Sequence, residues 1–101
     1  MAGEQLPHDA FLQDVRVDWE PGTAALRFVI EEKTITVKVR GLRLIKIPRE
    51  QPWGPSIWVN QTSGPVQAGG DMVKFLIEMQ SGDQIEIVGE NVAIDSSPRS
   101  V

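Results

Sequence analysis

Apolar and polar residues alternate with a period of two along most of the chain. The clearest example is 34–40, in which Ile35, Val37 and Val39 alternate with threonine, lysine and arginine. Successive side chains of a β-strand point to opposite faces, so this pattern predicts a strand with one buried face and one hydrated face. Residues 11–19 show the same alternation. Their apolar positions, which we expect to share the buried face, are Phe11, Val15, Val17 and Trp19.

Turn-forming residues separate the alternating segments at short intervals. Pro21-Gly22, Gly41 and Ser81-Gly82 are examples, because proline and glycine favour the backbone angles of tight turns. The predicted strands are 11–19, 24–31, 34–40, 42–47, 56–60, 72–80, 83–87 and 92–94. Many short strands in this arrangement predict an all-β fold, an antiparallel β-sandwich or small barrel of about seven to eight strands.

The segment 72–80 is compatible with two kinds of element. It is long enough for a helix, and its methionine, lysine, leucine and glutamate residues favour helices. We prefer a strand, because Ser81-Gly82 followed by 83–87 has the pattern of a hairpin turn and its second arm.

Length and composition predict one domain in a reducing compartment. The 101 residues suffice for a single hydrophobic core, which we place at about 9–95, with 1–7 and 96–101 as frayed tails. The chain has no cysteine, its first residues lack the pattern of a secretory signal, and no apolar run approaches bilayer length. These features predict a cytoplasmic protein without membrane attachment.

The charge distribution argues against a nucleic-acid or membrane partner. The formal net charge is −4, and residues 50–101 hold two Lys or Arg against seven Asp or Glu. Binding to phosphate groups needs a basic surface, so we expect neither partner. A basic run without an intervening acid consists of Lys38, Arg40, Arg43, Lys46 and Arg49. We interpret this run as a solvated strand face; a binding patch for an anion or an acidic partner is the alternative.

No pattern in the sequence indicates catalysis. His8 is the single histidine, so the metal-binding spacings that need two histidines are absent. No serine lies in a GxSxG motif, and no glycine-rich loop has a phosphate-binding spacing. We therefore predict no catalytic residue, no metal and no cofactor. The least favoured alternative is an enzyme in which His8 acts with carboxylates brought together by the fold, drawn from Asp9, Asp14, Asp18 and Asp71.

The segment 48–58 is the strongest candidate for a binding site. Its prolines fix φ and lack an amide donor, so the segment should run as an extended and accessible connection. The rigid frame around Trp53 would hold that ring at small entropic cost, as binding anchors require. For Trp58 we favour a structural role over the open end of the core. The predicted contact residues are Trp53, Trp58, Arg49, Glu50 and Ser56.

Four short patterns add a resemblance to a known group of proteins. They are His8-Asp9-Ala10, Asp18-Trp19, Pro52-Trp53-Gly54-Pro55-Ser56 and Met79-Gln80-Ser81-Gly82-Asp83. Together they resemble small uncharacterised bacterial all-β domains, some of which are immunity proteins of toxin systems. The resemblance spans most of the chain and implies a stand-alone bacterial protein of the cytoplasm that binds another protein. It carries over no catalytic residue.

Two functional hypotheses follow from these observations. The first is a non-enzymatic protein-interaction module whose partner is another protein or a second copy of the chain. The alternative is a β-sandwich that binds carbohydrate or another small ligand through exposed tryptophans. The exposure of Trp53 and Trp58 would separate a structural role of these residues from a binding role.

Overall fold

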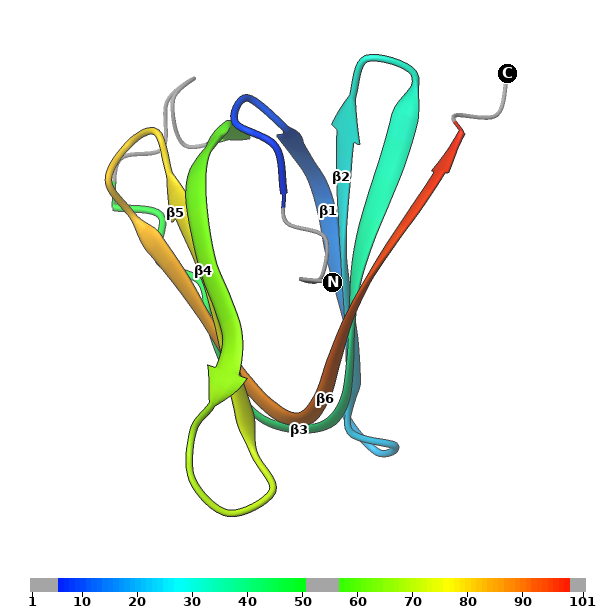
Figure 1. Ribbon diagram of the computed structural model, residues 1–101, viewed down its shortest axis with the longest axis vertical. Coiled ribbons are helices and arrows are strands. Elements are labelled where there is room, and N and C mark those ends of the chain that lie inside the picture. Colours follow the sequence, from blue (N-terminus) through cyan, green and yellow to red (C-terminus); the bar gives the residue numbers. More distant parts are fainter. Residues whose placement is uncertain (1–5, 51–56, 99–101) are drawn as a thin grey trace.

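The protein is built on one antiparallel β-sheet (Figure 1). The computed structural model describes residues 6–50 and 57–98. The strands are β1 (Phe11–Asp18), β2 (Thr23–Ile30), β3 (Lys33–Lys46), β4 (Val59–Gln67), β5 (Val73–Met79) and β6 (Gln84–Pro98). The sheet order is β1-β2-β3-β6-β5-β4. The predicted all-β class is confirmed, whereas a sandwich or barrel of seven to eight strands is not, because the described residues form six strands in one open sheet.

Two pairs of predicted strands are continuous in the structure. Residues 34–40 and 42–46 are both part of β3, and residues 84–87 and 92–94 are both part of β6. Gly41 lies inside β3 with a φ of 61°, a value that glycine adopts without strain, so it bends the strand instead of ending it. The smaller number of strands follows from these continuous connections.

The segment 72–80 forms a strand, as we preferred from the hairpin pattern. It contains β5, whose Phe75, Ile77 and Met79 are buried and share one face. Burial of one face of a sheet outweighs the moderate helix propensity of these residues. No helix able to cross a membrane occurs in the described part of the chain.

β3 and β6 pair along their whole length and curve together, which gives the sheet two arms (Figure 1). β1 and β2 continue the sheet beside the first part of β3, whereas β4 and β5 continue it beside the first part of β6. Gly89 is buried at this bend. A Cβ atom on Gly89 would lie 2.8 Å from Cγ1 of Val39 and 3.1 Å from the carbonyl oxygen of Arg40. The missing side chain therefore allows β6 to approach β3 where both curve.

The hydrophobic core contains side chains from both arms. Its largest fully buried members include Phe28 of β2, Phe75 of β5 and Ile87 of β6. Leu6, only 5% exposed, also belongs to this core, and β6 continues to Pro98. Leu6 and 96–98, which lie in the segments that the sequence predicts as tails, thus belong to the core and to β6.

The two outermost strands of the sheet meet at one point. Phe11 and Trp58 form an isolated antiparallel bridge. Beside it, the amide of Asp9 donates to the carbonyl of Val59 (2.9 Å), and the amide of Val59 donates to the carbonyl of Ala10 (2.8 Å). These bonds tie the start of β1 to the start of β4, so the end of the predicted binding segment is held against β1.

Candidate functional site

An apolar groove lies between the start of β1 and the residues that follow β3. Its volume is about 370 Å³. We call it the β1 groove. Its apolar lining residues are Phe11, Leu12, Val15, Ile47, Pro48, Ile57, Met79 and Ile85, and its polar lining residues are Gln13, Asp14 and Arg49.

The groove exists because β3 leaves β2 at its bend. β2 pairs with β3 only as far as Arg40, whereas β3 continues to Lys46. The space that opens between β1 and the end of β3 is lined at its sides by half-buried or exposed residues such as Val15 and Ile47. Met79, which belongs to the buried core, also lines it. The groove therefore reaches from the surface to the core.

The polar rim of the groove carries one uncompensated positive charge. Asp14 accepts a hydrogen bond from the guanidinium group of Arg27 on the neighbouring strand, which balances its negative charge. Arg49 is exposed and forms no ion pair with the described residues. This rim favours a ligand in which an acidic group lies beside an apolar one.

Trp58 supports one wall of the groove. Its ring packs edge to face against the ring of Phe11, with ring centroids 5.2 Å apart and an interplanar angle of 84°. Aromatic pairs in this geometry contribute about 0.5–1.5 kcal/mol beyond the burial of their area. Trp58 nevertheless remains 38% exposed, so it combines a structural contact with an accessible edge.

The structure places three of the predicted contact residues. Arg49 lines the β1 groove, Glu50 is exposed beside it in the chain, and Trp58 stands behind the groove wall. Trp53 and Ser56 lie outside the described residues.

Pro48 and Ile57 belong to the predicted binding segment 48–58, but the sequence patterns did not identify the other apolar residues of the groove as a binding surface. We expect Val15 on the buried face of the first strand and Ile47 at the end of the predicted strand 42–47, whereas Val15 is only half-buried and Ile47 is 38% exposed. The sequence feature that points to the groove is Ile47, a large aliphatic residue directly before Pro48 at the end of a predicted strand. The distance between β1 and this residue depends on the bend of β3, which the alternation of residues does not encode.

Trp19 has the highest exposed fraction, 85%, among the exposed large hydrophobic residues of the described chain. We predicted it on the buried face of the first strand, and this prediction is wrong. β1 ends at Asp18, and the amide of Gly22 donates to the carbonyl of Trp19 (3.1 Å), so Trp19 already belongs to the turn. The turn-forming Pro21-Gly22 pair overrides the alternation of the strand. Trp19 is therefore an additional candidate for an intermolecular contact.

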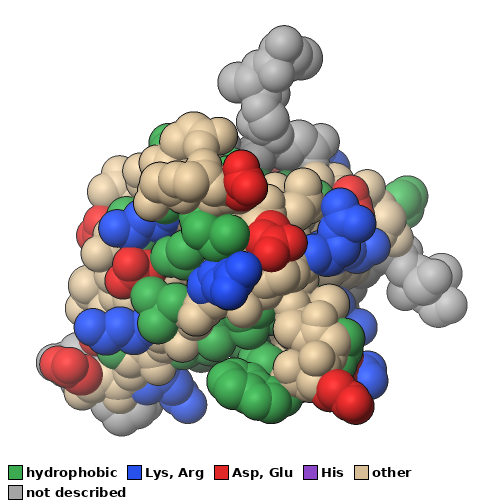
Figure 2. Space-filling view, turned by 90° about the horizontal axis from the view of Figure 1, so that it is seen from below, with side chains coloured by type: hydrophobic (Ala, Val, Ile, Leu, Met, Phe, Trp, Pro, Cys, Tyr) green, Lys and Arg blue, Asp and Glu red, His purple; other side chains and the backbone are tan. Residues whose placement is uncertain are grey.

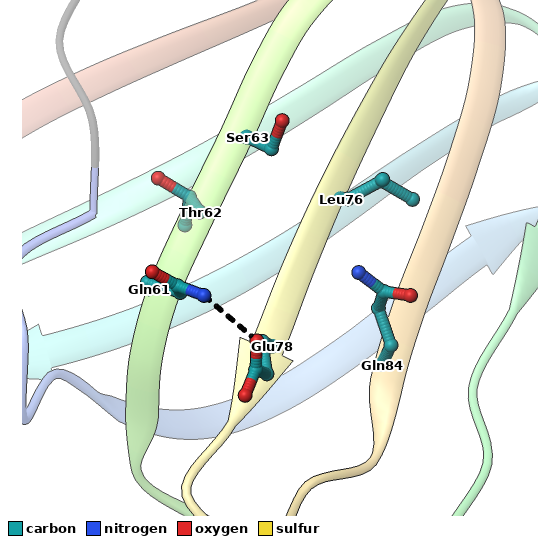
Figure 3. Close-up of a pocket in the computed structure, with 6 residues that line it drawn as sticks. All are labelled: Gln61, Thr62, Ser63, Leu76, Glu78 and Gln84. Carbon is teal, nitrogen blue, oxygen red and sulfur yellow. Dashed lines mark hydrogen bonds between the residues drawn. The ribbon is translucent and has the colours of Figure 1, made fainter.

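A second, polar hollow of about 310 Å³ lies over β4, β5 and the start of β6 (Figure 3). The side-chain amide of Gln61 donates to one carboxylate oxygen of Glu78 (2.9 Å), and the side-chain amide of Asn60 donates to the other (3.2 Å). Gln84 approaches from β6, and Leu76 provides an apolar patch between the strands (Figure 3). Side-chain amides and a carboxylate on a shallow surface are suited to ligands with hydroxyl groups.

His8 belongs to a chain of hydrogen bonds at the start of β4. Its Nδ1 donates to the carbonyl of Asn60 (2.9 Å), and its Nε2 lies 3.3 Å from Oδ1 of Asp9. The side-chain amide of Gln80 donates to the same oxygen of Asp9. His8 thus lies within reach of a carboxylate, but neither residue lines the groove or the polar hollow. No group of three or more potential metal ligands occurs within residues 6–50 and 57–98.

The convex side of the bend mixes apolar and charged side chains (Figure 2). The strand register places Leu44 opposite Val88, Val88 opposite Lys74, and Lys74 opposite Val66, so a lysine interrupts this apolar row. Leu44 is 42% exposed, close to the value for Ile47. It provides a matched control position outside the groove.

Comparison with known proteins gives no relative from which a function could be transferred: no family model and no curated protein matches the chain. We therefore infer a function from the geometry of the groove, the polar hollow and the exposed aromatic residues.

Proposed function

We propose that the protein is a non-enzymatic protein-interaction module. In this proposal, the β1 groove receives an apolar side chain from an extended segment of a partner protein, and Arg49 pairs with a carboxylate next to that side chain. The observation that carries the proposal is the combination of apolar walls with a cation at the rim, Arg49, that forms no ion pair with the residues the structure describes.

The groove by itself would supply only part of the affinity. Burial of one leucine-sized or phenylalanine-sized side chain contributes about 1.5–3 kcal/mol, and an exposed ion pair adds about 0–1 kcal/mol. Specific protein interfaces cover about 800 Å² on each partner. Neighbouring exposed groups must therefore take part, and Glu50 and Trp58 are suitable because both adjoin the groove lining in the chain or in space.

Inhibition of a toxin by an immunity protein is one function that such a module would perform, and the sequence resemblance supports this subclass. A cytoplasmic location is part of the same proposal. It is supported by the absence of cysteine, since disulfides are common in small secreted domains.

Carbohydrate binding is the second candidate function. It is supported by the polar hollow, in which Gln61, Glu78 and Gln84 place amide and carboxylate groups on three neighbouring strands (Figure 3). Both oxygens of Glu78 already accept hydrogen bonds from Gln61 and Asn60, which leaves fewer free acceptors for a ligand. We therefore rank this function below peptide binding.

Selection from a displayed library of random peptides tests the first proposal. We expect enriched peptides to contain a large apolar residue beside Asp or Glu. Their affinity, measured by fluorescence anisotropy, should fall at least about tenfold for Ile47→Asp, because a carboxylate in the groove removes an apolar contact and must itself lose water. Arg49→Glu should remove the preference for acidic residues in the peptide.

The matched control is Leu44→Asp, which introduces the same charge at a similarly exposed position on the convex face. It should leave peptide affinity unchanged. Equal binding to wild type and to Ile47→Asp would contradict the proposed site. Failure to enrich any peptide, together with glycan binding that is lost in Gln61→Ala and Gln84→Ala, would favour carbohydrate binding instead.

A further inference from the structure

The second part of β6 has a strand on only one side. β5 pairs with β6 as far as Gly89, whereas β3 pairs with β6 as far as Pro98. From Glu90 to Pro98, the edge of β6 that faces away from β3 has no strand partner among the described residues. In Figure 1 this part of β6, coloured brown to red, forms the margin of its arm, with β3 on one side and no strand drawn on the other.

The outer edges of β1 and β4 carry features that oppose strand addition. β1 has a register shift between Leu12 and Asp14, and its first residue is bridged to Trp58. β4 contains Pro65, which lacks an amide donor, at a second register shift. Natural proteins use such bulges and prolines to prevent pairing between exposed edges.

The free edge of β6 lacks these features over most of its length. Its pairing with β3 is unbroken from Asn91 to Pro98, where the strand ends. Asp95 is the single charged residue between these two positions. A regular edge with so little charge presents its unpaired amide and carbonyl groups to another strand.

We propose that a second copy of the chain pairs with this edge in antiparallel orientation, with the twofold axis at Ile94. This axis lies at the midpoint of the free edge, so every residue from Glu90 to Pro98 finds a partner. Directly opposite residues share one face of a sheet, which places Ile94 against Ile94 of the second copy on the inner face.

The charges of the outer face agree with this register. Ala93 lies opposite Lys38 within the chain, and the axis at Ile94 places Asp95 of the second copy on the other side of Ala93. Lys38 already pairs with Asp95 of its own chain, at 3.1 Å. The small side chain of Ala93 leaves the long lysine free to reach Asp95 of the second copy as well. An axis at Asp95 would instead place the two carboxylates directly opposite each other.

This surface is separate from the β1 groove, because β1 and β6 form opposite margins of the same arm. Dimer formation therefore does not depend on the proposed peptide binding. Ile47→Asp should leave the dimer intact, so failure of one proposal is distinguishable from failure of the other.

Sedimentation velocity over a dilution series, with two charge variants at one position, tests the dimer. Wild type should sediment as a dimer that dissociates on dilution. Ala93→Glu places carboxylates opposite Asp95 in two symmetric pairs and should raise the dissociation constant about tenfold. Ala93→Lys places an ammonium group there and should leave the constant unchanged or lower it. The exposed position of Ala93 should preserve the fold in both variants, which circular dichroism checks.

The contrast between glutamate and lysine distinguishes this register from others. With an axis at Ala93, the introduced side chain would lie opposite the same side chain of the second copy, so both variants would weaken the dimer equally. That result would overturn the proposed register. A monomer at every concentration would overturn the dimer itself. Hydrogen exchange of wild type provides an independent readout: amides between Glu90 and Pro98 should gain protection as concentration rises, and unchanged exchange there would contradict the proposal.

Discussion

Asp9 holds a backbone conformation that most residues avoid. Its φ is 74°, in the region that glycine favours, and Asp tolerates this region better than most residues because of its short polar side chain. The amide of Ala10 donates to the carbonyl of Pro7 (3.2 Å), which closes a turn around Asp9. Its carboxylate accepts a hydrogen bond from Gln80, so the turn is fixed to the end of β5.

Two substitutions separate the backbone effect from the side-chain effect at Asp9. Asp9→Ala loses the contact with Gln80 and keeps the strained φ, so it should lower the free energy of unfolding by about 1–3 kcal/mol. Asp9→Gly loses the same contact but relieves the strain, so it should be more stable than Asp9→Ala by roughly 1 kcal/mol. Urea unfolding measures both values. Equal free energies of unfolding for the two variants would show that the positive φ at this position does not lower stability.

The sequence predicts burial well for residues inside regular strands and poorly near their ends. Ile35, Val37 and Val39 are buried as their alternation indicated, because each lies in a strand with neighbours on both sides. Trp19 fits the same alternation but is exposed, because the turn begins one residue earlier than the pattern suggested. The end of a strand is decided by local turn formation and by long-range pairing together, and hydrophobic periodicity reports only the strand itself.

The shape of the sheet depends on how β3 and β6 bend together. Gly41 bends β3, and the register of the pair shifts between Leu42 and Leu44. Gly89, opposite Leu42, provides the close approach on β6. The bend of β3 at Gly41 therefore lies beside the position where Gly89 allows β6 to approach β3 closely.

Gly89→Ala should destabilise the protein through this bend. The added methyl group would clash with Val39 and with the backbone of Arg40, and overpacking of this kind costs about 1–3 kcal/mol. Thermal unfolding followed by circular dichroism measures the effect. Gly70→Ala serves as the comparison, because its Cβ would meet no atom within 4 Å and only the positive φ of 57° opposes it. A smaller loss for Gly89→Ala than for Gly70→Ala would contradict the proposed role of close packing.

The sequence indicated where strand-forming residues lie but not which segments join into one element. The sequence pattern predicts a turn at Gly41 and two separate strands at 83–87 and 92–94, because glycine most often ends a strand. Glycine also permits a bend inside a strand, and the choice between the two depends on whether the neighbouring strand continues. Pairing between β3 and β6 spans a long stretch of sequence, so no local pattern contains this information.

The two arms of the molecule are connected in two places. β3 and β6 run through both arms, and the bridge between Phe11 and Trp58 joins the outer strands at one end (Figure 1). The aromatic contact belongs to this second connection, so the rings should contribute to stability as a pair.

A double-mutant cycle of Phe11→Ala and Trp58→Ala measures this contribution. We expect a coupling free energy of about 0.5–1.5 kcal/mol, the range for edge-to-face aromatic pairs. The free energies of unfolding of wild type, both single variants and the double variant provide the value. Additive losses would indicate that the two rings stabilise the protein independently.

The candidate site could be predicted only in part, for reasons that belong to the whole molecule. Arg49 is predicted as a contact residue because it belongs to the proline-rich segment 48–58, and it lines the groove. Leu12 and Ile47, which form apolar parts of that groove, are far apart in the sequence and meet only after β3 has turned away from β2. The groove depends on how β1 and β3 are arranged in space, whereas the local sequence pattern indicates only where each strand lies in the chain.

The continuous pairing of β3 with β6 also determines the order in which the sheet is completed during synthesis. β1, β2 and the first part of β3 follow one another in the chain and pair as two successive hairpins. The opposite edge of the first part of β3, from Lys33 to Arg40, receives its neighbour only when Asn91–Pro98 has left the ribosome. Until then, β3 of the nascent protein has an unpaired edge along this first part. A chain truncated before Asn91 would keep that edge unpaired.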